Sequence, residues 1–181
     1  MRDVVLIVDV LDDFAHPSGK ELLASFAQRQ EGLAALLERS RLGQTPIVYA
    51  NDTKGIWDGD AHRLLDCALT GPGGHLIRPV APRPGDRFIV KPRYSAFDHT
   101  PLELILEDLE CERLVVAGMT TEGCVTQSAI DARELGLKVT VVPDACASTD
   151  ERVEKVALGY LVDVVGVVLE DCISAQGSTA S

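Results

Sequence analysis

The stretch DVVLIVDV, residues Asp3 to Val10, decides the fold class of this chain. Its run of Val, Ile and Leu is typical of a β-strand buried on both faces, and such strands occur in parallel sheets that helices cover on both sides. The next segment, Glu21 to Arg39, spaces its apolar side chains at helical intervals. Together the two segments predict a first β–α unit.

The same alternation continues along the chain. Further strands are expected at Thr45–Ala50, Arg87–Lys91, Arg113–Ala117, Lys138–Val142 and Val162–Leu169, and further helices at Ala61–Leu69, Leu102–Leu109, Glu122–Leu135 and from about Ser148 to Leu161. Ser148 and Glu151 have the spacing of a capping box, which would start the last of these helices. The pattern predicts a three-layer α/β/α fold around a doubly wound, mainly parallel, Rossmann-like sheet of six strands.

Length and composition fit one globular domain. The chain has 181 residues, of which 46% are hydrophobic and 25% charged, close to the average of soluble proteins. We therefore expect a single domain over residues 1–181, with a flexible tail from about residue 174. The formal net charge of −11 would repel nucleic acids and anionic lipid surfaces, so neither is expected as a partner.

The cysteines and the apolar runs predict the compartment. Five cysteines without a C-x-x-C spacing argue against a disulfide framework and against a zinc knuckle. The apolar runs are too short to span a bilayer, and the N-terminal residues lack the pattern of a secretory signal. We therefore expect a cytoplasmic protein with reduced thiols.

Three chemically capable side chains follow predicted strands at one edge of the sheet, where ligands of open parallel sheets bind. Asp9 ends the first strand, Lys91 ends the third, and Cys124 lies in the first turn of the helix after the fourth. A helix N-terminus favours the thiolate form of a cysteine. A carboxylate, an ammonium and a thiol together could provide the base, the charge stabiliser and the nucleophile of covalent catalysis.

Each of these residues also has an ordinary structural interpretation. Asp9 and Lys91 could be exposed residues at turns or strand ends, and Cys124 could be a small core residue. In the strand order 3-2-1-4-5-6, moreover, Lys91 would have to reach Asp9 across an intervening strand. The sequence alone does not guarantee that reach.

Three segments resemble the isochorismatase-like cysteine hydrolases, the superfamily of nicotinamidases and N-carbamoylsarcosine amidases. They are VDVLDDF (Val8–Phe14), KPRYSAF (Lys91–Phe97) and VAGMTTEGCVTQSAIDARELG (Val116–Gly136). The resemblance covers nearly the whole chain and implies that Asp9, Lys91 and Cys124 are the catalytic triad. It also implies a cis peptide between Met119 and Thr120, which would direct the N–H groups of Thr120 and Cys124 to one point as an oxyanion hole.

This chain differs from the nicotinamidases at the position of their metal motif. In nicotinamidases the second strand is followed by an Asp-x-His motif, whereas the segment NDTK, residues 51–54, keeps Asp52 but has Lys54 at the histidine position. An ammonium would repel a divalent cation, so no catalytic metal and no cofactor are expected. His62 and His75 could join Asp52 as ligands, but isolated histidines in polar loops are usually surface residues.

Other residues bear on substrate binding. Asp12 stands where the family commonly has asparagine, and its charge could raise the pKa of Asp9. Phe14, Trp57 and Tyr94 are candidates for lining an apolar pocket for a flat substrate. Trp57 could equally cover the edge of the core or a subunit contact.

The sequence favours an amidohydrolase that cleaves a C–N bond of a small carboxamide or ureido compound through a thioester on Cys124. By the resemblance, true isochorismatases replace the nucleophilic cysteine, so Cys124 favours amide chemistry. Two alternatives stay open: a vinyl-ether hydrolase in which Asp9 is the acid, and a catalytically silent binding homologue. The resemblance also implies a homodimer or homotetramer, and the substrate's identity is left open.

Overall fold

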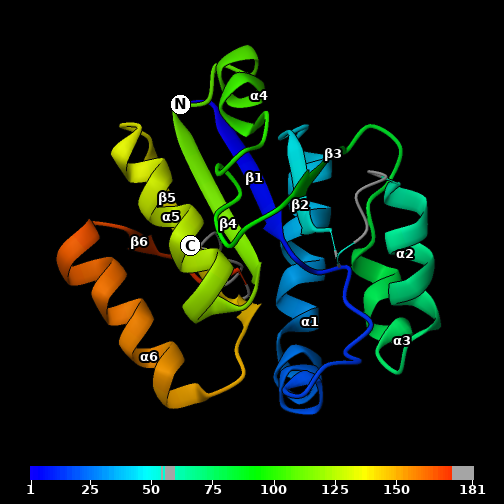
Figure 1. Cartoon of the computed structure of the whole chain (residues 1–181). Coiled ribbons are helices and arrows are strands. Elements are labelled where there is room, and N and C mark those ends of the chain that lie inside the picture. Colours follow the sequence, from blue (N-terminus) through cyan, green and yellow to red (C-terminus); the bar gives the residue numbers. More distant parts are fainter. Residues whose placement is uncertain (54, 56–59, 173–181) are drawn as a thin grey trace, which may run out of the picture.

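The computed structural model describes residues 1–53, 55 and 60–172, and these form one six-stranded sheet (Figure 1). The strands are β1 (Asp3–Val8), β2 (Ile47–Asp52), β3 (Arg87–Lys91), β4 (Arg113–Met119), β5 (Lys138–Ala147) and β6 (Val168–Leu169). All five strand pairs are parallel, in the order β3-β2-β1-β4-β5-β6. This is the strand order of doubly wound sheets, and the order reverses between β1 and β4, at the topological switch point.

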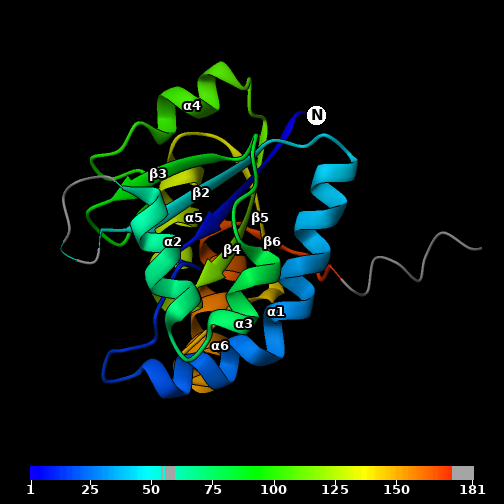
Figure 2. The same ribbon diagram turned by 90° about the vertical axis from the view of Figure 1, so that its right-hand side faces the viewer.

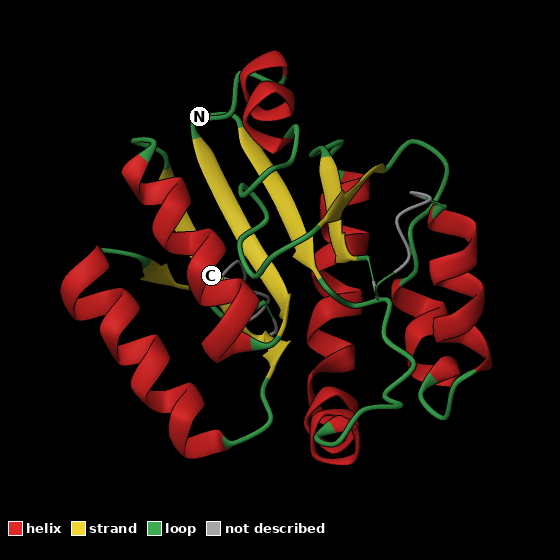
Figure 3. Cartoon of the chain, in the orientation of Figure 1, coloured by secondary structure: helices red, strands yellow, loops and turns green. Residues whose placement is uncertain are grey.

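Helices cover both faces of the sheet, which confirms the predicted three-layer α/β fold (Figure 3). They are α1 (Gly19–Leu42), α2 (Ala61–Thr70), α3 (Gly74–Ile77), α4 (Leu102–Asp108), α5 (Thr126–Glu134) and α6 (Glu151–Tyr160). Helices α1 and α5 both contact β5, and they lie on opposite faces of the sheet (Figures 1 and 2). No helix in the described part of the chain has the length and apolarity that a membrane crossing requires.

The strand at the centre of the sheet has the burial that its sequence predicts. Val4, Leu6, Ile7 and Val8 of β1 are all fully buried, because β2 and β4 flank the strand and helices cover both of its faces. At the end of β4, Gly118 has φ 125°, and a Cβ there would lie 2.0 Å from the carbonyl oxygen of Val8. Glycine therefore lets β4 approach β1 closely at the carboxyl ends of the two strands.

Two sequence predictions at the C-terminal end are wrong. Asp150 caps α6 by accepting a hydrogen bond from the N–H of Arg152, whereas Ser148 bonds to the backbone of Asp150 within the preceding loop. The predicted strand Val162–Leu169 is strand only at its last two residues. Its β-branched run is local evidence for a strand, but Leu161–Val165 extends the preceding helix as a π-helical turn that ends at Gly166 in the left-handed conformation.

Candidate active site

Asp9 follows β1 directly and adopts a left-handed backbone conformation, with φ 53°. Its N–H donates to the carbonyl oxygen of Ala50 at 2.9 Å, and the N–H of Asp52 donates to its Oδ1 at 2.6 Å. Strand β2 therefore fixes both the backbone and the carboxylate of Asp9 at the carboxyl edge of the sheet.

Lys91 is the last residue of β3, and its side chain is only 1% exposed. Its Nζ lies 2.6 Å from Oδ2 of Asp9 and 3.3 Å from Sγ of Cys124, and it donates to the carbonyl oxygen of Arg93 at 2.9 Å. The lysine side chain thus reaches Asp9 across the end of β2. The ammonium is placed between the carboxylate and the thiol.

Cys124 lies in the π-helical turn Thr121–Val125, hereafter the nucleophile turn, between β4 and α5. The carbonyl oxygen of Thr120 accepts hydrogen bonds from the N–H groups of Gly123 and Val125, at 3.1 and 3.2 Å. The peptide bond between Met119 and Thr120 is cis, as the family resemblance implies. The structure therefore brings together all three residues that the sheet-edge argument selected.

Burial controls the protonation of the three groups. It is the main cause that raises the pKa of Asp9, while the charge of Lys91 acts in the opposite direction. For Lys91, burial opposes the charged form, but the attraction of Asp9 and Cys124 prevails and raises its pKa. Burial, followed by repulsion from Asp9, raises the pKa of the Cys124 thiol to about 12.

The surroundings of Cys124 therefore favour the neutral thiol over the thiolate. This corrects the expectation of a favoured thiolate, because desolvation and the neighbouring Asp9 carboxylate raise the pKa of Cys124 more than Lys91 lowers it. Asp9 and the thiol interact directly, and in such an arrangement a carboxylate can accept the proton of a thiol.

A cavity of about 380 Å³ opens beside these residues. Its lining includes Asp9, Cys124, Met119 and Thr120 from the sheet edge, and Tyr94 from the segment after β3. The volume is in the range of small-molecule sites. Of the predicted substrate contacts, Tyr94 lies at this cavity and is 71% exposed, while Trp57 lies outside the described residues.

Phe14 is not part of the cavity lining. Its ring is buried in the core, with the centroid 6.0 Å from that of Phe26. The structure thus places Phe14 in the core, and its predicted contact with a substrate stays a prediction. An aromatic residue close to a catalytic motif in sequence can turn inward, and local pattern does not reveal which way it points.

Two polar residues of the cavity were not selected from the sequence. His16 places Nε2 3.6 Å from Oδ1 of Asp12, and both residues line the cavity. Asn51 is 2% exposed; its amide accepts from the N–H of Leu11 and donates to the carbonyl oxygen of Leu11, so it ties the segment after β1 to β2. The sequence hints at a role for Asn51 only in that a polar residue stands near the end of an apolar strand.

The expected absence of a catalytic metal depends on the residues that follow β2. Within the described ranges, no group of three histidine, cysteine or acidic side chains is placed to hold a metal ion. His62 and His75 are exposed on α2 and α3 and do not line the cavity. Lys54, on which the no-metal expectation rests, lies outside the described residues, so that expectation stays a prediction.

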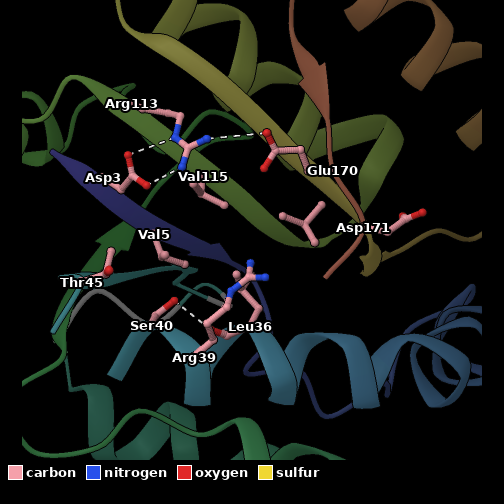
Figure 4. Close-up of a pocket in the computed structure, with 11 residues that line it drawn as sticks. Asp3, Val5, Leu36, Arg39, Ser40, Thr45, Arg113, Val115, Glu170 and Asp171 are labelled. Carbon is pink, nitrogen blue, oxygen red and sulfur yellow. Dashed lines mark hydrogen bonds and ion pairs between the residues drawn. The ribbon is translucent and has the colours of Figure 1, made fainter. Parts of the chain in front are cut away.

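A second cavity, of about 280 Å³, lies toward the amino ends of β1 and β4 (Figure 4). Its central cation, Arg113, pairs with the carboxylate of Asp3, with Nε 3.0 Å from Oδ1, and with Glu170 at 3.6 Å. These charges hold β1 and β4 to the segment after β6. No cysteine is among the residues that line this cavity, whereas Cys124 lines the cavity at the opposite edge of the sheet.

Comparisons with known proteins identify the family of this chain. Residues 3–171 match the family model described as the isochorismatase domain. The chain is 28% identical over 161 residues to the uncharacterized isochorismatase family protein YaaI of Bacillus subtilis, which covers 89% of each chain. It is 27% identical over 149 residues to maleamate amidohydrolase of Pseudomonas putida, covering 78% of this chain and 70% of that protein.

Solved structures show the same fold. The nicotinamidase PncA from Bacillus subtilis superposes with a TM-score of 0.77 at 24% identity, covering 94% of this chain and 100% of that chain. The family model spans almost the whole sequence, including the segments that carry Asp9, Lys91 and Cys124. The chain therefore belongs to the isochorismatase family.

Proposed function

We propose that this protein is a cysteine amidohydrolase that cleaves a C–N bond of a small carboxamide or ureido compound and releases ammonia. The observation that carries the proposal is the position of the Lys91 ammonium, 2.6 Å from Asp9 and 3.3 Å from the Cys124 thiol, at the wall of a cavity. The similarity to maleamate amidohydrolase supports the same reaction class.

In the acylation half of the reaction, Asp9 takes the proton of the Cys124 thiol as Sγ attacks the carbonyl carbon. The oxyanion accepts hydrogen bonds from the N–H groups of Thr120 and Cys124. Protonated Asp9 then donates to the nitrogen of the leaving group, the C–N bond breaks, and ammonia leaves a thioester on Cys124. Lys91 keeps a positive charge beside the site while the negative charge moves from Asp9 to the thiolate and the oxyanion.

In the deacylation half, Asp9 removes a proton from water, and the hydroxide attacks the thioester carbon. The C–S bond breaks, the acid is released, and the proton on Asp9 returns to the thiolate. The raised pKa of Asp9 suits this cycle, because a base that must also act as an acid works best when its pKa is near the working pH. The exposed Tyr94 at the cavity is the proposed contact for the remainder of the substrate.

A second candidate is a vinyl-ether hydrolase in which Asp9 protonates the substrate. The burial that raises the pKa of Asp9 is the observation in its favour, since it helps a carboxyl group act as a proton donor. In that reaction Cys124 forms no covalent intermediate. Turnover of an aryl enol ether that survives Cys124→Ser would favour this candidate over the amidohydrolase.

The test is a screen for ammonia release over primary carboxamides and ureido compounds. We expect Cys124→Ala to abolish turnover and Asp9→Asn nearly to abolish it. Cys67→Ala is the matched control, because Cys67 is a free, exposed thiol on α2 and should tolerate the change. Brief mixing with the best substrate should add the mass of an acyl group to Cys124. A Cys124→Ala enzyme with full activity would contradict the proposal.

A further inference from the structure

A buried carboxyl group lies behind the nucleophile turn and has no part in the proposed mechanism. Glu154 of α6 is 5% exposed, and its Oε1 accepts a hydrogen bond from Oγ1 of Thr121 at 2.8 Å. Its Oε2 lies 3.4 Å from Nη2 of Arg29 on α1. Burial of a carboxyl group is costly unless it is paired and hydrogen-bonded, so these contacts need an explanation.

Thr121 connects this carboxyl group to the nucleophile turn. It is the first residue of that turn, is fully buried, and directly follows Thr120, a proposed oxyanion donor. Its hydroxyl also lies 3.2 Å from the carbonyl oxygen of Ala147. Because a hydroxyl donates only one proton, the nearer Glu154 oxygen is the preferred acceptor.

The backbone of the same residue is held as well. The carbonyl oxygen of Thr121 accepts from Oγ1 of Thr126 at 2.6 Å. From within the turn, Oε1 of Glu122 accepts from the N–H and Oγ1 of Thr149, at 3.3 and 2.9 Å. The nucleophile turn is therefore fixed from the α6 side, and neither Thr121 nor Glu154 lines the cavity.

We propose that Glu154 is a positioning residue that acts through Thr121 on the oxyanion hole. By holding the first residue of the nucleophile turn, it keeps the N–H groups of Thr120 and Cys124 directed at the developing oxyanion. Such donors stabilise a transition state only when they are already in position, and small misplacements cost large factors in rate. This inference rests on the proposed amide hydrolysis.

Two matched pairs of variants test the contact. Glu154→Gln keeps an acceptor for the Thr121 hydroxyl and Glu154→Leu removes it; Thr121→Ser keeps the hydroxyl and Thr121→Val removes it at nearly constant shape. We expect Glu154→Leu and Thr121→Val to lower kcat about tenfold with KM almost unchanged. The Gln and Ser variants should keep most of the activity. The double variant should be no worse than either single one, because both remove the same contact.

Alkylation of Cys124 by iodoacetamide separates positioning of the oxyanion hole from general damage. This substitution joins Sγ to carbon and expels iodide without forming an oxyanion, so its rate should change less than twofold in all four variants. The role of Glu154 would be overturned if the alkylation rate fell in step with kcat. It would also be overturned if both Glu154→Leu and Thr121→Val kept the wild-type kcat. Either result would leave the proposed function standing. Absence of ammonia release by the wild-type protein would overturn both. If Glu154→Leu does not fold, the comparison of Thr121→Val with Thr121→Ser tests the proposal.

Discussion

The Lys91 ammonium lies 2.6 Å from the Asp9 carboxylate although their strands, β3 and β1, are separated by β2. Parallel register makes this contact possible: Lys91 is paired with Asp52 at the end of β2, and the N–H of Asp52 donates to the same carboxylate. The long lysine side chain then needs to cross only the end of one strand. This ion pair controls the charge of the site, and several predictions depend on it.

The first prediction concerns the Cys124 thiol. The Asp9 charge is the second cause, after burial, that raises its pKa to about 12. Asp9→Asn removes that repulsion while Lys91 remains, so the pKa should fall, and iodoacetamide should alkylate Cys124 faster at pH 7–8 although turnover is lost. The measurement is the pH profile of alkylation at Cys124, read by peptide mass, with exposed Cys67 as the reference in the same sample. Slower alkylation in the variant would contradict the assigned electrostatics.

The second prediction concerns the loss of the buried cation. Lys91→Met leaves the carboxyl of Asp9 without its charged partner, which should lower the free energy of unfolding by about 3 kcal/mol at neutral pH. Turnover should fall because Asp9 becomes protonated and ceases to be a base. The measurements are denaturant unfolding and ammonia release.

The pH dependence of the stability of Lys91→Met gives a further check. In the folded variant Asp9 should stay protonated to a higher pH than in the unfolded chain, where it ionises near its usual pKa of about 4. The unfolded chain then binds fewer protons as pH rises, so the folded variant loses stability above that pKa. The stability difference from wild type should be smaller at pH 4 than at pH 8, and a difference independent of pH would contradict the assignment.

The third prediction concerns Arg113 at the second cavity. Its side chain is 26% exposed and pairs with Asp3 and Glu170 (Figure 4). Arg113→Met should lower the free energy of unfolding by about 1 kcal/mol, a modest effect because the ion pairs are partly solvated. Arg113→Lys should recover only part of this loss, since lysine lacks the fork that contacts both oxygens of Asp3. Thermal unfolding measures the effect, and the alkylation rate of Cys124 should not change.

The fourth prediction concerns Gly118. Alanine there would meet the carbonyl oxygen of Val8 at 2.0 Å in a backbone conformation with φ 125°, so Gly118→Ala should lower the free energy of unfolding by at least about 2 kcal/mol. Gly159→Ala is the control, because Gly159 is helical and a Cβ there meets nothing within 4 Å. That variant should be unchanged or stabilised by up to about 1 kcal/mol. Equal stability of the two variants would contradict the close approach of β4 to β1.

The helix that follows β5 shows where sequence reasoning stops. The run after Tyr160 is rich in valine and predicts a strand, yet Leu161–Val165 continues the helix and leaves Val162 and Val164 exposed. Propensity is a weak guide at the edge of a sheet, where a strand has a neighbour on one side only. Phe14 shows the same limit for a side chain, because its direction depends on the packing of Phe26 and not on its own neighbours in sequence.

The sequence by itself determined the α/β class with its doubly wound, mainly parallel sheet, and it selected the three residues that meet at one edge of that sheet. Apolar runs and polar strand ends are local features, and the family motifs occur at recognisable spacings. Only the tertiary structure decided that Lys91 reaches Asp9, that burial raises the pKa of Cys124, that Phe14 belongs to the core, and that Glu154 contacts Thr121. These properties depend on burial and on contacts between residues far apart in the chain, which local sequence patterns do not encode.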